Sequence, residues 1–243
     1  MPKSSSKTKI GIIGAMKVEV KDLISAMANK KKTRIARMDF YEGRIEGVRV
    51  VVVQSGIAKV HMAVCAQILI DRFGVTHLIN TGVAGSLNKN VNIEDVVVST
   101  ELVHHDLDAT PVGFELGEVP GCPVYFPSHK KLTKFFMRVI GDVAQTISPQ
   151  TTVHQGRIAS GERFVAEAAD KRRIVKHFDA LATEMEGASL AQVAWLNRIP
   201  FVVLRSISDN ANEESPLDYP TFEKRAAKLM ATCIREALKE WND

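Results

Sequence analysis

Short apolar runs alternate with stretches of helical spacing along most of the chain. Apolar runs closed by glycine or polar residues are typical of buried strands, and an apolar spacing near 3.6 residues is typical of helices. Strands are predicted at 9–15, 77–82, 95–106, 154–162, 180–186 and 200–209, with a hairpin at 40–56 that turns at Glu46-Gly47. Helices are predicted at 18–30, 59–74, 131–144, 166–177, 187–198 and 220–241.

This alternation predicts an α/β fold. We expect a three-layer α/β/α sandwich in which helices cover both faces of a mixed, largely parallel sheet. No internal repeat or linker divides the chain, so we expect a single domain over residues 9–243, preceded by a polar, disordered segment at residues 1–8. The region 107–128 is rich in Gly and Pro and is predicted to be a long functional loop.

Composition indicates the broad class of the protein but not its function. The chain has 243 residues, of which 45% are hydrophobic and 25% charged, as is usual for a soluble globular protein. The net charge of +4 comes from separated clusters without interleaved aromatic residues, which argues against a nucleic-acid partner. Three cysteines without metal-type spacing favour a reducing compartment. The first apolar run meets charge too soon for a signal peptide or membrane span, so we expect a cytoplasmic protein.

Acidic and small residues gather after the predicted strands, in "GAMKVEV", "TGVAGS", "SGERF", "EMEGAS" and "SDNAN". Ligands of α/β sheets bind at the carboxyl ends of strands, where Glu19, Glu186 and Asp209 are expected. Cleavage of a bond to an anomeric carbon needs an acid for the leaving group and a carboxylate for water. A third carboxylate can accept hydrogen bonds from sugar hydroxyls. The structural alternative is that each acid only stabilises a helix N-terminus.

Seven segments extend this pattern: "KIGIIGAMKVEV", "SGIAKV", "INTGVAGSL", "HHDLDAT", "GRIASGERFV", "TEMEGASLAQVA" and "PFVVLRSISDNAN". In this order they resemble the 5'-methylthioadenosine/S-adenosylhomocysteine nucleosidases of the purine nucleoside phosphorylase superfamily, over nearly the whole chain after residue 8. The resemblance implies a nucleoside phosphorylase-like fold and hydrolysis of the N-glycosidic bond of 5'-thio-substituted adenosines, without metal or organic cofactor. It leaves 5'-deoxyadenosine and aminodeoxyfutalosine open as substrates.

The resemblance also implies a role for each site residue. Glu19 is the general base for water, Asp209 protonates adenine N7 with the help of Ser208, and Glu186 holds the ribose hydroxyls beside the Met185 backbone. The other implied contacts are adenine stacking by Phe164, adenine recognition by the main chain of Val165, Arg205 near the water, the backbone of Val83, Ala84 and Gly85 along the sugar, and an apolar 5' pocket of Met16, Ile57 and Tyr219. Val112, Phe114 and Pro120 would reach into the site of a partner subunit, since the family is typically homodimeric.

Several positions depart from the family pattern. Val83 stands where many members carry serine, Glu162 where aspartate is usual, and Val112 where an aromatic residue is common. Glu19 is the one acid in "GAMKVEV", where several members have three. These changes bear on substrate preference more than on the reaction.

Four other interpretations fit the sequence less well. A phosphorolytic relative needs arginine and backbone donors for phosphate, whereas the loop after the first strand carries Met16 and Glu19 and no arginine. A non-catalytic nucleoside-binding protein should lack an acid at position 19 or 209. Adjacent histidines in "HHDLD" alternate faces of a strand and do not easily share a metal ion. "GIIGAM" lacks the spacing of a dinucleotide-binding loop. Helical spacing places Trp195 in the core.

Overall fold

The computed structural model describes residues 8–209 and 219–241, with side chains from residue 222 onward in the second range. The strands are β1 (Ile10–Gly14), β2 (Ala28–Ile35), β3 (Met38–Ile45), β4 (Val48–Gln54), β5 (His77–Ser86), β6 (Val96–His104), β7 (Phe126–Pro127), β8 (Val153–Ser160), β9 (Ala182–Glu184) and β10 (Phe201–Asp209). The helices are α1 (Lys17–Ser25), α2 (Lys59–Phe73), α3 (Lys130–Ile147), α4 (Ala168–Phe178), α5 (Gly187–Asn197) and α6 (Tyr219–Lys239), with a short 3-10 helix at Thr110–Val112.

The strands of the described residues form one mixed sheet in the order β10-β6-β8-β9-β5-β1-β4-β3-β2, and β7 pairs with β6. Strands β4, β1, β5 and β10 are mutually parallel, as are β6, β8 and β9, but the two groups run in opposite directions. Because β10 also pairs with β5, the five strands β5, β10, β6, β8 and β9 close into a ring. The expected α/β sheet is confirmed, with antiparallel junctions between its two parallel groups.

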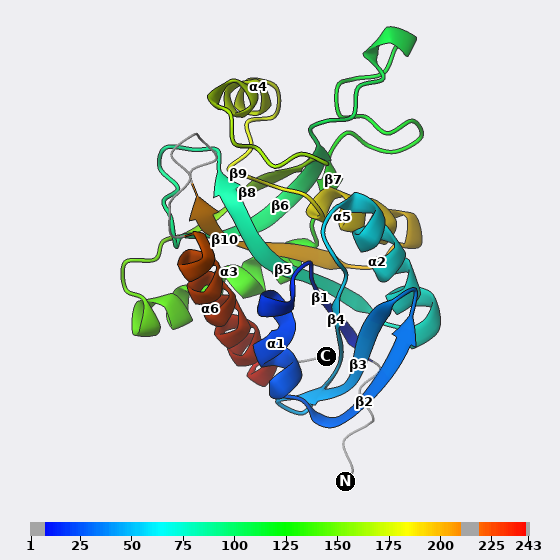
Figure 1. Cartoon of the computed structure of the whole chain (residues 1–243), viewed down its shortest axis with the longest axis vertical. Coiled ribbons are helices and arrows are strands. Elements are labelled where there is room, and N and C mark those ends of the chain that lie inside the picture. The colour runs from blue at the N-terminus through cyan, green and yellow to red at the C-terminus, as the bar shows by residue number, and fades with distance from the viewer. Residues whose placement is uncertain (1–7, 210–218, 242–243) are drawn as a thin grey trace.

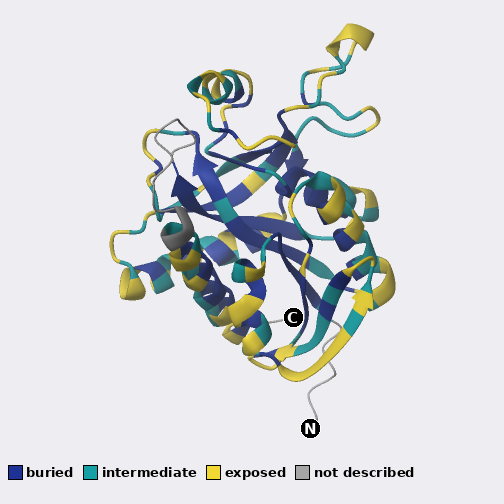
Figure 2. Ribbon diagram, viewed as in Figure 1, coloured by how far each residue is buried: buried dark blue, intermediate teal, exposed yellow. Residues whose placement is uncertain are grey.

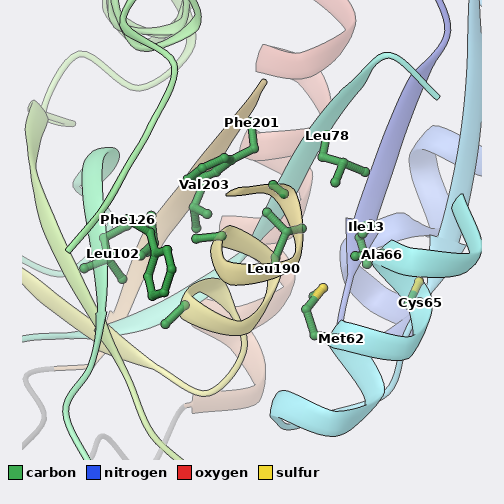
Figure 3. Close-up of a cluster of buried hydrophobic side chains, with 14 of the residues drawn as sticks. Ile13, Met62, Cys65, Ala66, Leu78, Leu102, Phe126, Leu190, Phe201 and Val203 are labelled. Atoms are coloured by element: carbon green, nitrogen blue, oxygen red, sulfur yellow. The ribbon is translucent and has the colours of Figure 1, made fainter. Parts of the chain in front are cut away.

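Helices cover both faces of the sheet, as predicted (Figure 1). On one face, α2 and α5 lie side by side and bury Met62, Cys65 and Leu190 against the strands (Figure 3). On the other face, α1, α3 and α6 bury a second cluster that includes Phe136 and Ile234. These two apolar clusters, one on each side of the strands, are the two interfaces of the three-layer sandwich.

The segment after α1 is the main departure from the predicted elements. The helix expected over 18–30 ends at Ser25, and residues 28–35 form the edge strand β2. Met27 remains buried although it lies beyond the helix, so apolar spacing continued where helical structure did not. Most of β2 is exposed (Figure 2), and its lysines discourage edge-to-edge pairing with another sheet. A strand exposed on both faces has no apolar alternation from which to predict it.

The remaining boundaries follow the sequence closely. Gly74 ends α2 in the left-handed conformation with a φ of 61°, as its position after the apolar spacing indicated. The loop at 107–128 carries only the 3-10 helix and the short β7, and its first part projects from the body of the molecule (Figure 1). The expected disordered segment at 1–8 falls almost entirely outside the described residues. None of the helices in the described ranges combines the length and apolar character needed to span a bilayer.

The contact between α2 and β1 should be a main source of stability. Leu69 is fully buried, and its Cδ1 atom would lie 3.1 Å from a Cβ atom at Gly11, so the leucine packs directly onto the strand backbone. We expect Leu69→Ala to lower the free energy of unfolding by about 2–5 kcal/mol, measured by urea denaturation. Exposed Arg72→Ala on the same helix is the control and should change it by less than about 0.5 kcal/mol. Equal losses in both variants would contradict this packing.

Candidate active site

Most of the predicted site residues line one cavity. It lies where the first turn of α1, the ends of β5, β9 and β10, and the loop after β8 meet. Its predicted lining residues are Met16, Glu19, Ile57, Val83, Ala84, Gly85, Phe164, Val165, Met185, Glu186, Ser208 and Asp209. Gly85 explains how opposed strands share the site, because it pairs with Asp209 of β10 on one side and Thr183 of β9 on the other.

Glu19 is a buried carboxylate held by backbone amides. Its Oε2 atom accepts a hydrogen bond of 2.8 Å from the Met16 amide, and its Oε1 atom accepts one of 3.2 Å from the Val83 amide. Burial raises the pKa of Glu19, and these amides together with the charge of Arg205 oppose the rise. The carboxylate is therefore fixed in position and is a stronger base than an exposed glutamate.

Two glycines make room for this carboxylate. A Cβ atom at Gly82 would lie 2.6 Å from Glu19 Oε1, and one at Gly14 would lie 2.8 Å from Glu19 Cβ. Any larger residue at either position would displace Glu19. The small residues that the sequence places after β1 and within β5 are thus required by the close approach of α1 to the sheet.

Glu186 is the N-cap residue of α5 and also lines the cavity. Its Oε1 atom accepts a hydrogen bond of 2.8 Å from the amide of Ala58, a residue with a φ of 84°. Ala58 thus adopts a backbone conformation that favours glycine, at the position where its N–H is directed at the site. Burial and the negative charge of Glu184 raise the pKa of Glu186 to about 7, against the opposing charge of Arg205.

Glu184 and Arg205 form a buried ion pair beneath the cavity. Glu184 accepts hydrogen bonds from the Arg205 guanidinium, the Ser160 hydroxyl and the Gly187 amide. Arg205 also donates a bond of 2.5 Å to Asn80 Oδ1. Burial would raise the pKa of Glu184, but Arg205, Ser160 and Gly187 together hold it below the ordinary value. Glu184 is therefore held as an anion, and its charge acts on the neighbouring Glu186.

Asp209 ends β10 and is almost fully buried. Its Oδ2 atom accepts a hydrogen bond of 2.9 Å from the Ser208 hydroxyl, as expected for the neighbour that positions it. The pairing of β10 with β5 is irregular between Ile207 and Asp209. This irregularity lets Ser208 and Asp209, which are adjacent in sequence, both line the cavity.

Apolar side chains line the same cavity as these acids. The Phe164 side chain is 53% exposed although it lines the cavity, and the neighbouring Val165 is buried. Ile57 is also half exposed at the rim. An exposed aromatic ring beside a polar cavity is suited to stacking with a planar heterocycle.

Three groups of predicted residues lie elsewhere. Arg205 is buried behind the cavity lining, where it contacts the acids and not the open space. Tyr219 begins α6, but its side chain lies outside the described residues. Val112, Phe114 and Pro120 lie on the projecting loop and do not line the cavity of their own chain.

Four cavity-lining residues were not predicted: Ala15, Arg163, Thr183 and Glu184. Glu184 had a signal in the sequence, because it precedes Glu186 by two residues at the end of a predicted strand. The partners that make it an internal anion, Ser160 and Arg205, are distant in sequence and gave no such signal.

The charges of the cavity are predominantly negative. Among the described residues that line it, Glu19, Glu184, Glu186 and Asp209 are acidic, and Arg163 is the one cation. Arg163 forms an ion pair with Asp170 of α4, at 3.1 Å. A cavity with this balance repels an anionic co-substrate such as phosphate and suits water as the nucleophile.

Comparisons with known proteins agree with this geometry. The model of the phosphorylase superfamily matches residues 9–239. A 5'-methylthioadenosine/S-adenosylhomocysteine nucleosidase from an Exiguobacterium species is 43% identical over 232 residues, covering 95% of this chain and 97% of that protein.

Solved structures of such enzymes share the fold. S-adenosylhomocysteine nucleosidase from Streptococcus pyogenes, in complex with 5-methylthiotubericidin, superposes with a TM-score of 0.92 at 33% identity and covers 99% of this chain and 100% of that chain. The Neisseria meningitidis 5'-methylthioadenosine/S-adenosylhomocysteine nucleosidase, in complex with methylthio-immucillin-A, has a TM-score of 0.89 at 37% identity, with coverage of 96% and 100%. The chain therefore belongs to the phosphorylase superfamily and, within it, to the family of 5'-methylthioadenosine/S-adenosylhomocysteine nucleosidases.

Proposed function

We propose that the protein hydrolyses the N-glycosidic bond of 5'-thio-substituted adenosines, 5'-methylthioadenosine and S-adenosylhomocysteine foremost, and releases adenine. The observation that carries this proposal is the acidic cavity, in which Glu19, Glu186 and Asp209 line one space beside the exposed ring of Phe164. The absence of an uncommitted arginine among the described lining residues favours hydrolysis over phosphorolysis.

Asp209 acts on the leaving group. Adenine is a poor leaving group as an anion, so a proton on N7 lowers the barrier to its departure. The Ser208 hydroxyl donates a hydrogen bond to Asp209 Oδ2 and so fixes the orientation of the carboxyl group. Phe164 stacks on the purine, and the main chain of Val165 hydrogen-bonds its Watson–Crick edge. Both residues lie in the segment that follows β8 and line the same cavity.

Glu19 acts on the water. As adenine leaves, the ribose becomes oxocarbenium-like, and a nearby carboxylate both stabilises that charge and accepts a proton from the attacking water. The raised pKa of Glu19 suits a general base. Val83 offers the water no hydroxyl, so Glu19 and backbone groups of β5 orient it. Arg205, behind the cavity lining, offsets the negative charge of the neighbouring glutamates.

Glu186 binds the ribose. The described residues donate no hydrogen bond to its Oε2 atom, and Arg205 Nη2 lies 4.0 Å away, so this oxygen can accept hydrogen bonds from the 2'- and 3'-hydroxyls. The Met185 backbone lies beside it, and Val83, Ala84 and Gly85 follow the sugar along β5. Met16 and half-exposed Ile57 form the apolar wall for the 5' substituent.

A second copy of the chain covers the rim of the site. Val60 and Val64 on α2 and Trp195 and Leu196 on α5 are large apolar residues with 72%, 42%, 41% and 59% of their surface exposed. The prediction that Trp195 belongs to the core is wrong, because α5 turns this side chain to its outer face. An apolar stripe of this kind on a soluble protein is a mark of association.

The projecting loop carries a further exposed apolar residue. Val112, at the end of the 3-10 helix, is 74% exposed. We infer a homodimer in which the α2–α5 stripes meet and each loop brings Val112, Phe114 and Pro120 over the partner's 5' pocket. Val112 is small for this position, so bulky 5'-thio groups are tolerated.

The nature of the nucleophile can be tested directly. In phosphate-free buffer, the protein should convert 5'-methylthioadenosine into free adenine and a free 5-thiopentose, identified by chromatography. Added phosphate should not accelerate the reaction, because no lining residue of the described chain is available to bind it. A requirement for phosphate, with a sugar 1-phosphate as product, would show that the protein is a phosphorylase. S-adenosylhomocysteine, 5'-deoxyadenosine and aminodeoxyfutalosine, run in parallel, define the 5' preference.

The two catalytic acids should be separable from the fold. Glu19→Gln and Asp209→Asn should each lower kcat by about 10²–10⁴-fold, because each removes one positioned proton transfer. Circular dichroism should show unchanged secondary structure. Asp142→Asn, on the exposed surface of α3, is the matched control and should retain wild-type kcat. Near-normal turnover in a folded Asp209→Asn enzyme would remove Asp209 from its proposed role.

Assembly and activity should fail together when the loop is altered. Val112→Asp places a charge in the proposed interface, so we expect dissociation by light scattering and a loss of activity on the same samples. Ile147→Asp, which replaces another exposed apolar residue at the end of α3, should leave both unchanged. A monomer with full activity at assay concentrations is the result that rules out the shared site.

A further inference from the structure

The carboxylate with the most protein contacts in the site is Glu184, which has no role in the proposed chemistry. Its Oε1 atom accepts hydrogen bonds from Ser160 Oγ and, at 3.0 Å, from the Gly187 amide. Its Oε2 atom accepts from Arg205 Nη2, from the Glu186 amide at 3.1 Å and from the Gly187 amide at 2.8 Å. These donors occupy the lone pairs of both oxygens, so Glu184 is not available to substrate although it borders the cavity.

Glu184 joins three parts of the fold that end at the site. Ser160 is the last residue of β8, Arg205 lies within β10, and Glu186 and Gly187 begin α5. The Ser160 hydroxyl completes this connection, because its oxygen also accepts a hydrogen bond of 2.7 Å from the Ala188 amide. The first turn of α5, and with it the backbone of Glu186, is therefore anchored to one carboxylate.

Arg205 is the group that needs to be held. Its Nη2 atom bonds to Glu184 and Asn80 but lies only 4.0 Å from Glu186 Oε2. That oxygen is the one proposed to receive the ribose hydroxyls. Without Glu184, the buried guanidinium would have Glu186 as its nearest anion, and a small movement would pair the two.

We propose that Glu184 is a positioning residue, which retains Arg205 and the first turn of α5 so that Glu186 Oε2 stays free for the ribose hydroxyls. This inference rests on the proposed function, since it assigns Glu184 a task in the binding of ribose. It differs from a purely structural role because it predicts a defined change in the chemistry of Glu186.

The charge of Glu184 has a second consequence for Glu186. Three charged groups bear on that carboxyl: Glu184 from β9, Arg205 from β10 and Glu19 from α1. From α2 it meets the Ala58 amide. After burial, Glu184 is the largest influence that raises the pKa of Glu186, and Arg205 is the largest that lowers it. Without Glu184, its repulsion is lost and Arg205 can approach Glu186 more closely. Both changes lower the pKa of Glu186.

The test is Glu184→Gln, with Ser160→Ala as a milder second variant. Glu184→Gln should raise KM for 5'-methylthioadenosine at least tenfold, while kcat falls less, because ribose binding is affected first. The acid limb of the pH profile of kcat/KM should move down by about one pH unit or more. Ser160→Ala keeps the charge of Glu184 and removes the two hydrogen bonds of the hydroxyl, to Glu184 and from the Ala188 amide, so it should raise KM modestly and leave the acid limb in place.

Asp95→Asn is the matched control. Asp95 is equally buried and is likewise bonded by backbone amides, from Asn92 and Thr152, but it does not line the cavity. This variant should lose stability without altering KM or the pH profile. If Asp95→Asn reproduces the changes of Glu184→Gln, the effect is general destabilisation and the proposal is wrong.

A measurement without substrate separates this proposal from the proposed function. Because its folded pKa is raised from 4.5 to about 7, Glu186 contributes stability that is fully present below pH 4.5 and is lost as the pH rises through 7. The difference in unfolding free energy between wild type and Glu186→Gln should therefore decline from pH 5 to pH 8. In a Glu184→Gln background, the decline should move to lower pH. An unmoved decline overturns the role of Glu184, whereas failure of the wild type to release adenine overturns the proposed function alone.

Discussion

A single buried guanidinium holds the site together. Arg205 is 1% exposed, and it is surrounded by Glu184, Glu186 and Glu19, whose charges keep its pKa high against the effect of burial. Three carboxylates of like charge in one small space would repel one another and take up protons. With one cation among them, Glu184 can remain an anion while Glu186 keeps a raised pKa. The other features of the cavity depend on this balance.

The topology of the sheet makes this arrangement of charges possible. Parallel strands alone would place all carboxyl ends at one edge, yet Glu184 ends a strand that runs opposite to β10, which carries Arg205. Closure of five strands into a ring brings these opposed strands against β5 from both sides. The residue Gly85 is the point of contact. A buried ion pair between two strands of opposite direction then becomes possible without a loop crossing the core.

Each sequence pattern predicts only the structural property that gives rise to it. Apolar spacing records burial, so it located the helices and the central strands but missed β2, which is exposed on both faces. Acids at strand ends record proximity to a ligand, and with the resemblance they identified Glu19, Glu186 and Asp209, which share one cavity. Glu184 belongs to the same pattern, but its task depends on Ser160 and Arg205, whose proximity is a product of tertiary structure. Trp195 has the apolar spacing of a core residue, but its side chain lies on the exposed face of α5, which the spacing alone does not reveal.

Hydrogen bonds from backbone amides to the carboxylates explain why the small departures of this chain are tolerable. In the proposed function, Val83 offers no hydroxyl to the attacking water, but the carboxylate of Glu19 is held by two amides and does not depend on that group. Ala58 retains a strained backbone where glycine would be relaxed, because its amide satisfies Glu186 Oε1. In both cases backbone donors, which mutation of a side chain does not remove, orient the reactive carboxylates. Side-chain changes then act on the walls of the cavity, where they alter the fit of the 5' substituent and leave the chemistry in place.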